Sequence, residues 1–431
     1  MGSAAGHDKV ARHATVVNVS GIGSRSSSNP QGAATSRVLI WAAEGGAAAL
    51  GVVFEPARAD DVDELLRLYR KVYGRGYALP LGTDPQVMAA HVAAPDTTWL
   101  VGRDGSAGRV VASILATRSV SDRLAKMQGL VVDPDSRGSG VAQDAVRTLS
   151  DWLLDSREVD SVYSTARTTA TAPQRICLRA GFRGFGIFPN QRKAAGYETM
   201  VLLVRHREGV LHRRVPVARI PVQLGPIMDA LDDVPGMPVR PERVASDIVH
   251  PRCEPGAGEV ELIGAERFVL RRFDEVLTDP GRRFYPFHQP NVLLADSDGG
   301  YEVYAHLSPA DGYCALIGAA PAARVVTKHL DQIIQRLADA GAHHVETLVP
   351  LDAFDELGAL LSYGFLPAAV YPAMRAEGRE PTGFHDYVVM ARTMQPLDFR
   401  NLAIDGVFRP FAEQYIALWT RMYLNTQGVF R

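Results

Sequence analysis

The stretch that most constrains the fold of this chain covers residues 130–142, LVVDPDSRGSGVA. Its apolar run ends at Asp133-Pro134, a pair that neither continues a strand easily nor fits inside a helix. Beyond Gly140, apolar residues recur at helical spacing. A strand, a glycine turn and a helix N-terminus together predict an anion site, because glycine lets the backbone approach a ligand and the first helical N–H groups point at it. An ordinary strand-to-helix turn has the same pattern, so the rest of the chain must decide between the two interpretations.

The bulk composition narrows the classes of function. A chain of 431 residues with a net charge of −2 has room for two or three domains and has no basic footprint for nucleic acid. No apolar run approaches the roughly eighteen residues of a membrane span, and the N-terminus lacks a signal-peptide pattern. Cys177, Cys253 and Cys314 are far apart and lack metal-ligand spacing. We therefore expect a cytoplasmic protein without nucleic-acid or membrane partners.

Composition and periodicity divide the chain into four parts. Residues 1–50 are rich in Gly, Ala and Ser and are expected to be a flexible N-terminal segment. Residues 51–206 read as one α/β domain, and residues 207–259 as a Pro- and Arg-rich connector. Residues 260–431 read as a second domain that ends in a helix, because Phe411, Tyr415 and Trp419 share helical spacing.

The first domain is predicted to follow the order β-α-α-β-β-β-α-β-α-β-β. The expected strands and helices are, in turn, 52–54, 62–69, 86–93, 98–102, 109–116, 128–132, 141–153, 159–165, 172–179, 182–188 and 198–204. Gly181 is expected to terminate the helix over 172–179. The last two strands are expected to close the sheet as an antiparallel pair.

Motifs at three points of this order point to a known family. Arg137, Gly140 and Ala142 form an Arg-x-x-Gly-x-Ala pattern after the fourth strand. The pair Asp133-Pro134 leads into it, and Ala180-Gly181-Phe182 ends the later helix. With these features, residues 51–206 resemble the GNAT superfamily of N-acyltransferases. The resemblance implies a mixed α/β fold, a twisted and mostly antiparallel sheet flanked by helices.

Residues 260–395 repeat this order in a weaker form, which predicts two GNAT-like domains in tandem. The expected elements are strands at 291–294, 301–307, 313–318 and 344–349, helices at 325–340 and 354–362, and a closing pair at 368–374 and 386–391. The glycine turn is missing, because Ala320, Pro321 and Ala323 stand in its place. We expect this degenerate copy to bind no cofactor, and to wall the substrate site or form an interface.

The resemblance also implies an acyl donor on a phosphopantetheine arm, which is acetyl-CoA or a longer acyl-CoA, with an acyl-carrier protein as another option. The cofactor-binding residues that it implies are Leu130, Val131, Val132, Arg137, Gly138, Ser139, Gly140, Val141, Ala142 and Gln174. Backbone groups of the strand would pair with the arm, and the turn would take the pyrophosphate. A threonine cap on the helix over 172–179 competes with any role for the nearby side chains in binding the arm.

The acid and base of the reaction are less clear from the sequence. Members of the family often carry a Tyr four residues before the Gly-Phe pair, whereas this chain has Cys177, which is either a proton donor or a buried core thiol. The Glu that often heads the fourth strand is also absent, and Lys126, Met127 and Gln128 stand there. Glu198 and Tyr163 are therefore the candidates for the base.

No metal site is expected. His343 and His344 point to opposite faces of a strand, so they and Glu346 cannot converge on one ion. Asp296 and Asp298 resemble part of a calcium loop, but a hairpin turn accounts for both.

Two functions fit these observations. The first is an N-acyltransferase in which an amine attacks the thioester directly, since this reaction needs few side chains. Tandem members of the family include enzymes with bulky acceptors, so the acceptor is expected to be a small-molecule or peptide amine, and a homodimer is compatible with the sequence. The alternative is a non-catalytic acyl-CoA sensor, which the missing Tyr and Glu favour.

Overall fold

The computed structural model describes residues 51–74, 77, 80–105, 107–194, 196–232, 234, 236–237, 240–246, 259–376 and 382–424. The expected flexible segment 1–50 and part of the connector lie outside these residues. The chain divides into two compact units. The first contains residues 1–93, 99–114 and 130–145, and the second contains residues 94–98, 115–129 and 146–431. Strands β2 (Thr97–Asp104), β3 (Val110–Ser119) and β4 (Leu124–Val132) and helix α3 (Val141–Asp155) contribute to both units.

The first unit is organised around helix α1 (Val62–Tyr73), which buries an apolar stripe as its sequence spacing predicts. Strand β1 (Val52–Pro56) pairs antiparallel with β2. Helix α2 (Pro85–Ala93) follows a 3₁₀ turn at Pro80–Gly82. The guanidinium of Arg103 on β2 forms ion pairs with Glu55, with the buried Asp61 and with Glu64. This one cation therefore fixes β1, β2 and the start of α1 to one another.

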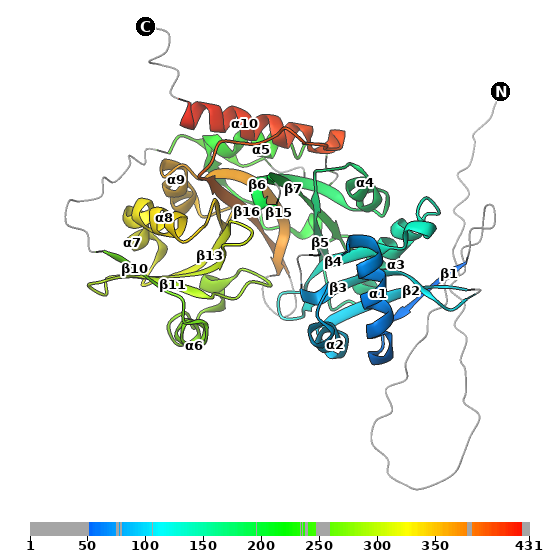
Figure 1. Cartoon of the computed structure of the whole chain (residues 1–431). Coiled ribbons are helices and arrows are strands. Elements are labelled where there is room, and N and C mark those ends of the chain that lie inside the picture. The colour runs from blue at the N-terminus through cyan, green and yellow to red at the C-terminus, as the bar shows by residue number, and fades with distance from the viewer. Residues whose placement is uncertain are drawn as a thin grey trace, which may run out of the picture. The chain divides into compact units, whose positions relative to one another are not determined.

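The second unit contains a large, mostly antiparallel mixed sheet (Figure 1). Its further strands are β5 (Ser161–Arg167), β6 (Arg183–Lys193), β7 (Tyr197–His206), β10 (Val260–Ile263), β11 (Val292–Asp296), β12 (Glu302–Ser308), β13 (Tyr313–Ala320), β14 (His344–Pro350), β15 (Leu366–Ala376) and β16 (Phe384–Thr393). Their order from β4 is β4-β5-β7-β6-β15-β16-β14-β13-β12-β11-β10. Among the pairings of the described residues from β4 to β10, β4 pairs with β5 and β13 with β14 in parallel. The expected fold class is confirmed.

This sheet is flanked by helices α4 (Ala172–Arg179), α6 (Glu266–Val276), α8 (Leu330–Asp339), α9 (Phe354–Ser362) and α10 (Arg409–Tyr423). The connector contains β8 (Arg219–Pro221), α5 (Gly225–Asp229) and β9 (Glu242–Val244). Helix α10 packs against β15, β6 and α5, and its buried residues include Phe411 and Tyr415 (Figure 1). None of the helices in the described part of the chain combines the length and apolarity that a membrane span requires.

Several element bounds differ from the sequence prediction. Strand β4 begins at Leu124, before its predicted start at residue 128. The apolar pattern did not reveal these first residues because Lys126 interrupts it. The helix predicted over 325–340 is divided into α7 (Ala323–Val326), a 3₁₀ turn and α8, and the β-branched run Val325-Val326-Thr327 disfavours a continuous helix. Helix α10, for which the spacing of Phe411, Tyr415 and Trp419 set no start, begins at Arg409, and Pro410 suits its first turn. The bounds of α4 and α9 are as predicted.

One backbone approach between the two halves of the second unit, residues 146–206 and 260–393, is especially close. Strands β6 and β15 pair antiparallel with Gly186 opposite Ala369. A Cβ atom on Gly186, whose φ is +156°, would lie 2.3 Å from Ala369 Cα. Glycine is therefore the residue that this approach of two backbones permits. The strands of the two halves recur at one spacing. Strand β14 begins 183 residues after β5, and β15 begins 183 residues after β6.

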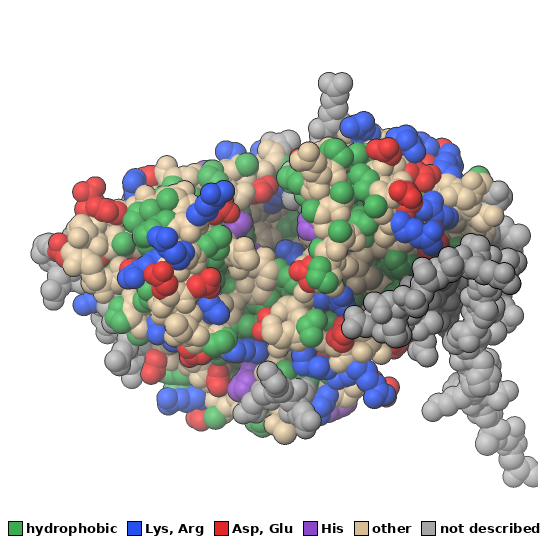
Figure 2. Space-filling view, turned by 90° about the horizontal axis from the view of Figure 1, so that it is seen from below, with side chains coloured by type: hydrophobic (Ala, Val, Ile, Leu, Met, Phe, Trp, Pro, Cys, Tyr) green, Lys and Arg blue, Asp and Glu red, His purple; other side chains and the backbone are tan. Residues whose placement is uncertain are grey.

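The surface carries charges of both signs. On the face drawn in Figure 2, Lys and Arg side chains are interspersed with Asp and Glu side chains rather than gathered into a field of one sign. This agrees with the net charge of −2.

The buried ion pair between Arg214 and Asp386 leads to the first prediction. Their side chains are 9% and 3% exposed, the charged atoms are 2.6 Å apart, and Asp386 also accepts the N–H of Ala373. Arg214→Met leaves a buried carboxylate without its counter-charge, so the free energy of unfolding should fall by about 3–5 kcal/mol in urea titrations. Arg409→Gln, which breaks an exposed pair on α10, should cost no more than about 0.5 kcal/mol. Equal losses in the two variants would contradict the prediction.

Candidate functional site

The turn that follows β4 is fixed to its surroundings by Asp133. Its carboxylate accepts the N–H of Asp135, and its own N–H donates to Val111 O on β3. Lys71 Nζ lies 2.7 Å from both the Asp133 and the Asp135 carboxylates. Burial alone would raise the pKa of Asp133, but the hydrogen bonds from Lys71 and from the Asp135 N–H, together with the charges of Lys71 and Arg109, outweigh it and the pKa is lowered. The residues of the turn are thus held by α1 and β3 in the first unit.

The glycines of this turn leave its outer side open. Gly138 and Gly140 have φ values of +81° and +89°, which favour glycine. A Cβ on Gly138 would meet no atom within 4 Å, and one on Gly140 only an Asp144 carboxylate oxygen at 3.9 Å. The hydrogen-bond ladder of α3 starts with Asp144 N–H donating to Gly140 O, so the N–H groups of residues 141–143 precede it. The turn therefore has the geometry of an anion site.

Arg137 adds a positive charge to this turn. Its side chain is exposed, and among the described residues it has no ion-pair partner. An uncommitted guanidinium beside a helix N-terminus can bind a phosphate oxygen with two hydrogen bonds.

In the second unit, β4 and β5 part after three residue pairs. Leu124, Ala125 and Lys126 lie opposite Ser161, Val162 and Tyr163, and the parallel register ends there although both strands continue. Strands β13 and β14 show the same behaviour, since their register ends at Leu316 and Thr347. Two diverging parallel strands leave an edge to which an extended chain of amide groups can add.

A buried carboxylate, Glu346 on β14, lies near this point. Tyr285 Oη and Tyr313 Oη donate to its Oε1 at 2.5 and 2.6 Å, and Gln191 Nε2 and His344 Nε2 lie 3.1 Å from its Oε2. Burial would raise the pKa of Glu346, but these donors outweigh it and lower the pKa to about 2. The four donors occupy the acceptor capacity of both oxygens, so Glu346 is a fixed negative charge.

Lys126 faces this negative charge from β4. Burial lowers the pKa of the Lys126 ammonium, and the charge of Glu346 only partly opposes the effect. The same lysine contributes to lowering the pKa of His288 to about 4, after the larger effect of burial. No hydrogen bond or ion pair of Lys126 is found among the described residues. Lys126 is therefore a half-buried amine without a direct partner in the described part of the chain, placed at the last residue pair of β4 and β5.

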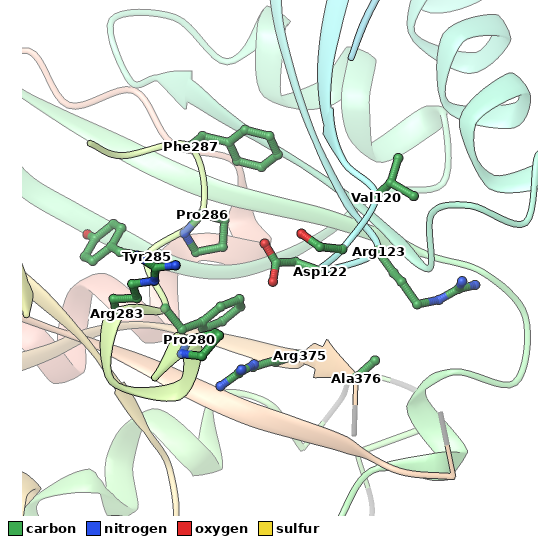
Figure 3. A pocket seen from close by; sticks show the side chains of 12 residues that line it. Val120, Asp122, Arg123, Pro280, Arg283, Tyr285, Pro286, Phe287, Arg375 and Ala376 are labelled. Atoms are coloured by element: carbon green, nitrogen blue, oxygen red, sulfur yellow. The ribbon is translucent and has the colours of Figure 1, made fainter. Parts of the chain in front are cut away.

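A cavity of about 760 Å³ opens in the second unit (Figure 3). The loop before β4, the segment before β11 and the end of β15 line it with Val120, Ser121, Asp122, Arg123, Pro280, Arg283, Phe284, Tyr285, Pro286, Phe287, Arg375 and Ala376. Two of these residues connect the cavity to the buried groups. Tyr285 donates to Glu346, and the ring of Phe287 lies 5.9 Å from that of Tyr163. The cavity therefore abuts the point where β4 and β5 part.

The residues that form this turn belong to a segment that matches a known protein family. Residues 62–182 match the acetyltransferase (GNAT) family model. These residues form a GNAT acetyltransferase domain. The family match implies acetyl-CoA as the acyl donor.

Solved structures with low sequence identity were also found. Ribosomal-protein-S18-alanine N-acetyltransferase from Escherichia coli is 16% identical, with a TM-score of 0.31, and the match covers 36% of this chain and 93% of that one. Ribosomal-protein-S5-alanine acetyltransferase from Vibrio fischeri is 11% identical, with a TM-score of 0.33 and coverages of 37% and 94%. A GNAT-family acetyltransferase from Streptococcus pneumoniae is 14% identical, with a TM-score of 0.32 and coverages of 36% and 99%. No curated protein matches the chain. At these TM-scores the likenesses carry no conclusion about function.

The cofactor-binding residues predicted from the GNAT resemblance occupy both units. Residues 130–132 and 137–142 lie together in the first unit, at the end of β4 and the start of α3. Gln174 lies in the second unit on α4. Its side chain donates to Arg167 O, Ala170 O and Ala403 O and accepts the N–H of Asp405, so it ties α4 to the segment before α10.

The predicted catalytic residues Cys177, Glu198 and Tyr163 all lie in the second unit. Cys177 is buried on α4, and burial raises the pKa of its thiol to about 12. Glu198 accepts two hydrogen bonds from Arg167, at 2.6 and 2.8 Å. Burial raises the pKa of Tyr163, whose ring also packs against Tyr371. Sequence reasoning missed Lys126 as a site residue, although a lysine inside an apolar strand is a usable signal.

His343 and His344 lie on different sides of their strand, as alternation predicts. The ring of His343 lies 5.7 Å from that of Tyr197, whereas His344 contacts Glu346 and Pro189 O. No group of three His, Cys, Asp or Glu side chains suited to a metal ion occurs in the described part of the chain.

The lowered pKa of Glu346 leads to a prediction for acid stability. A carboxyl whose pKa is about 2 when folded and 4.5 when unfolded stabilises the fold above the unfolded value, and this contribution is lost as the pH falls toward 2. Between about pH 5 and pH 2 the wild type should lose about 3 kcal/mol that Glu346→Gln does not lose. Urea titrations across this range measure the difference. Glu413→Gln, at an exposed position on α10, should keep the slope of the wild type. If Glu346→Gln lost as much unfolding free energy as the wild type over this pH range, the prediction would be wrong.

Proposed function

We propose that this chain is an N-acyltransferase that transfers an acyl group from a phosphopantetheine thioester to an amine, which attacks the thioester directly. The observation that carries the proposal is the open turn at Gly138 and Gly140, with Arg137 beside it, inside a GNAT acetyltransferase domain. Acetyl-CoA is the donor that the family implies. A longer acyl-CoA or an acyl-carrier protein presents the same phosphopantetheine arm and belongs to the same proposal.

The residues of the turn fit the charge and shape of the donor. The N–H groups of residues 141–143 and the guanidinium of Arg137 would hold the pyrophosphate. Backbone groups of Leu130, Val131 and Val132 would pair with the amides of the arm, and one of their N–H groups would polarise the thioester carbonyl. When bound, the donor supplies an activated acyl group, and the chain orients it.

Lys126 is our candidate for the group that takes the proton from the acceptor amine. Glu198 is committed to Arg167, and the oxygens of Glu346 are already occupied by donors. Lys126 has a lowered pKa and no direct partner among the described residues, so its neutral amine can accept a proton. Cys177 remains a thiol at neutral pH, but burial raises its pKa to about 12 and makes it a weaker acid than an ordinary thiol, so we do not propose it as the proton donor to the leaving thiolate.

The second half of the chain is proposed to be a degenerate copy that serves the acceptor rather than the donor. Strands β13 and β14 pair and part as β4 and β5 do. Strand β13 ends at Ala320 and is followed by Pro321-Ala322, which lacks the glycines of the first turn and has a proline in place of one backbone donor. This half supplies instead Glu346, Tyr285 and most of the cavity wall.

The first test concerns the donor site. Gly140→Glu places a negative side chain and a strained backbone where the pyrophosphate would lie, so the affinity for acetyl-CoA should fall at least about a hundredfold in isothermal titration. Gly209→Glu is the matched control, because Gly209 also has a positive φ (+81°) and open space around its Cβ position. Equal affinity of the wild type and Gly140→Glu for acetyl-CoA, or no binding by either, would contradict the placement of the donor site at this turn.

The second test concerns the proton acceptor. Lys126→Arg keeps the charge opposite Glu346 but cannot release its proton. Its turnover with acetyl-CoA and an amine should fall about a hundredfold or more, with little change in KM, and the rise in rate with pH that reports Lys126 should disappear. Turnover is measured as the rate at which the thiol of the donor is released. Lys328→Arg, at an exposed position, is the control. Unchanged turnover would contradict the assignment, and donor binding without turnover in the wild type would identify a sensor instead.

A further inference from the structure

The cavity of the second unit is lined by four charged side chains, and two of them are already neutralised. Arg123 forms an ion pair with Asp160, which is 2% exposed. Arg283 pairs with Asp274 at 2.8 Å and also lies over the ring of Phe273. Neither of these arginines needs a ligand to balance its charge.

The other two charges, Asp122 and Arg375, have no counter-charge in the part of the chain that the structure describes. Asp122 accepts a hydrogen bond from Ser119 Oγ, and Arg375 lies over the ring of Phe284 and hydrogen-bonds Tyr387. Among the described residues, neither forms an ion pair, with each other or with a third group. Figure 3 shows the two side chains entering the same space from different elements, the loop before β4 and strand β15. The cavity thus offers one negative and one positive group.

The rest of the lining is largely apolar. Phe284, Pro286 and Phe287 form one wall, and Phe284 packs with the buried residues Leu124, Met374 and Tyr387 beneath it. A volume of about 760 Å³ is in the range of sites for small organic molecules. Aromatic walls with one polar group of each sign suit an apolar body that carries two opposite charges.

We infer that this cavity binds a zwitterionic acceptor, an amino acid or short peptide whose ammonium group is held by Asp122 and whose carboxylate is held by Arg375. The inference rests on the proposed function, because it names the class of amine that is acylated. It also fits the place of the cavity, since Asp122 lies four residues before Lys126 on the segment that enters β4. The cavity that would hold this amine also contacts, through Tyr285 and Phe287, the groups at the point where β4 and β5 part.

Isothermal titration without any acyl donor tests this inference apart from turnover. The probes are two zwitterions with different charge separation, L-phenylalanine and glycyl-L-phenylalanine, and two analogues with a single charge, phenethylamine and 3-phenylpropanoate. At least one zwitterion should bind about tenfold more tightly than either analogue, because it engages both charges. Arg375→Gln should remove this advantage and leave phenethylamine unaffected, whereas Asp122→Asn should weaken phenethylamine and leave 3-phenylpropanoate unaffected.

Arg271→Gln is the matched control, since Arg271 is 71% exposed on α6 and lies outside the cavity. It should bind all four probes as the wild type does. Equal affinity for the four probes, binding of none of them, or unchanged affinities in Arg375→Gln and Asp122→Asn would each overturn the inference. A zwitterion that binds as expected but is not acylated would uphold the site and refute the proposed function, so the two failures are distinguishable.

Discussion

One buried carboxylate, that of Glu346, holds together the part of the second unit on which the cavity depends. Its four donors come from β6, from the segment before β11, from β13 and from β14 itself. Removing a carboxylate from water is costly, and this cost is offset only when each oxygen finds its donors. The four segments must therefore lie within a narrow range of positions, and one of the donors, Tyr285, is also part of the cavity wall. Packing and the shape of the cavity thus follow from one requirement for hydrogen bonds.

The other charged side chains of the second unit discussed above fall into two groups, those with a partner of opposite charge and those without one among the described residues. Asp160 is paired with Arg123 and Arg207, and Asp386 with Arg214, so these charges stabilise the structure and are closed to ligands. Among the described residues, the half-buried Lys126 has no direct partner, and Asp122 and Arg375 face a cavity without counter-ions. Uncompensated charges cost stability, which makes them informative about function. Lys126 lies at the last residue pair of β4 and β5, and Asp122 and Arg375 line the cavity.

The sequence was a good guide to local structure and a poor one to tertiary contacts. Pro134, Gly138 and Gly140 predicted the turn because each acts through its own backbone. Glu198 was a reasonable candidate for the base until its neighbour across the sheet, Arg167, was known. The donors of Glu346 lie far apart in the chain, so no local pattern could reveal that cluster. The spacing of His344 and Glu346 places them on one face of β14, where the structure joins them by a hydrogen bond, with His344 Nε2 3.1 Å from Glu346 Oε2.

The joint between β6 and β15 has a consequence for how the chain is made. Ala369 follows Gly186 by 183 residues, so a ribosome needs roughly 10 to 40 s to supply the partner of β6. During that time β6 is the open edge of a sheet and a template for pairing with other chains. Strand β6 carries Gly184, Gly186 and Pro189, residues that pair poorly in strands. The glycine that later permits the close contact with Ala369 thus also protects the unfinished chain from aggregation.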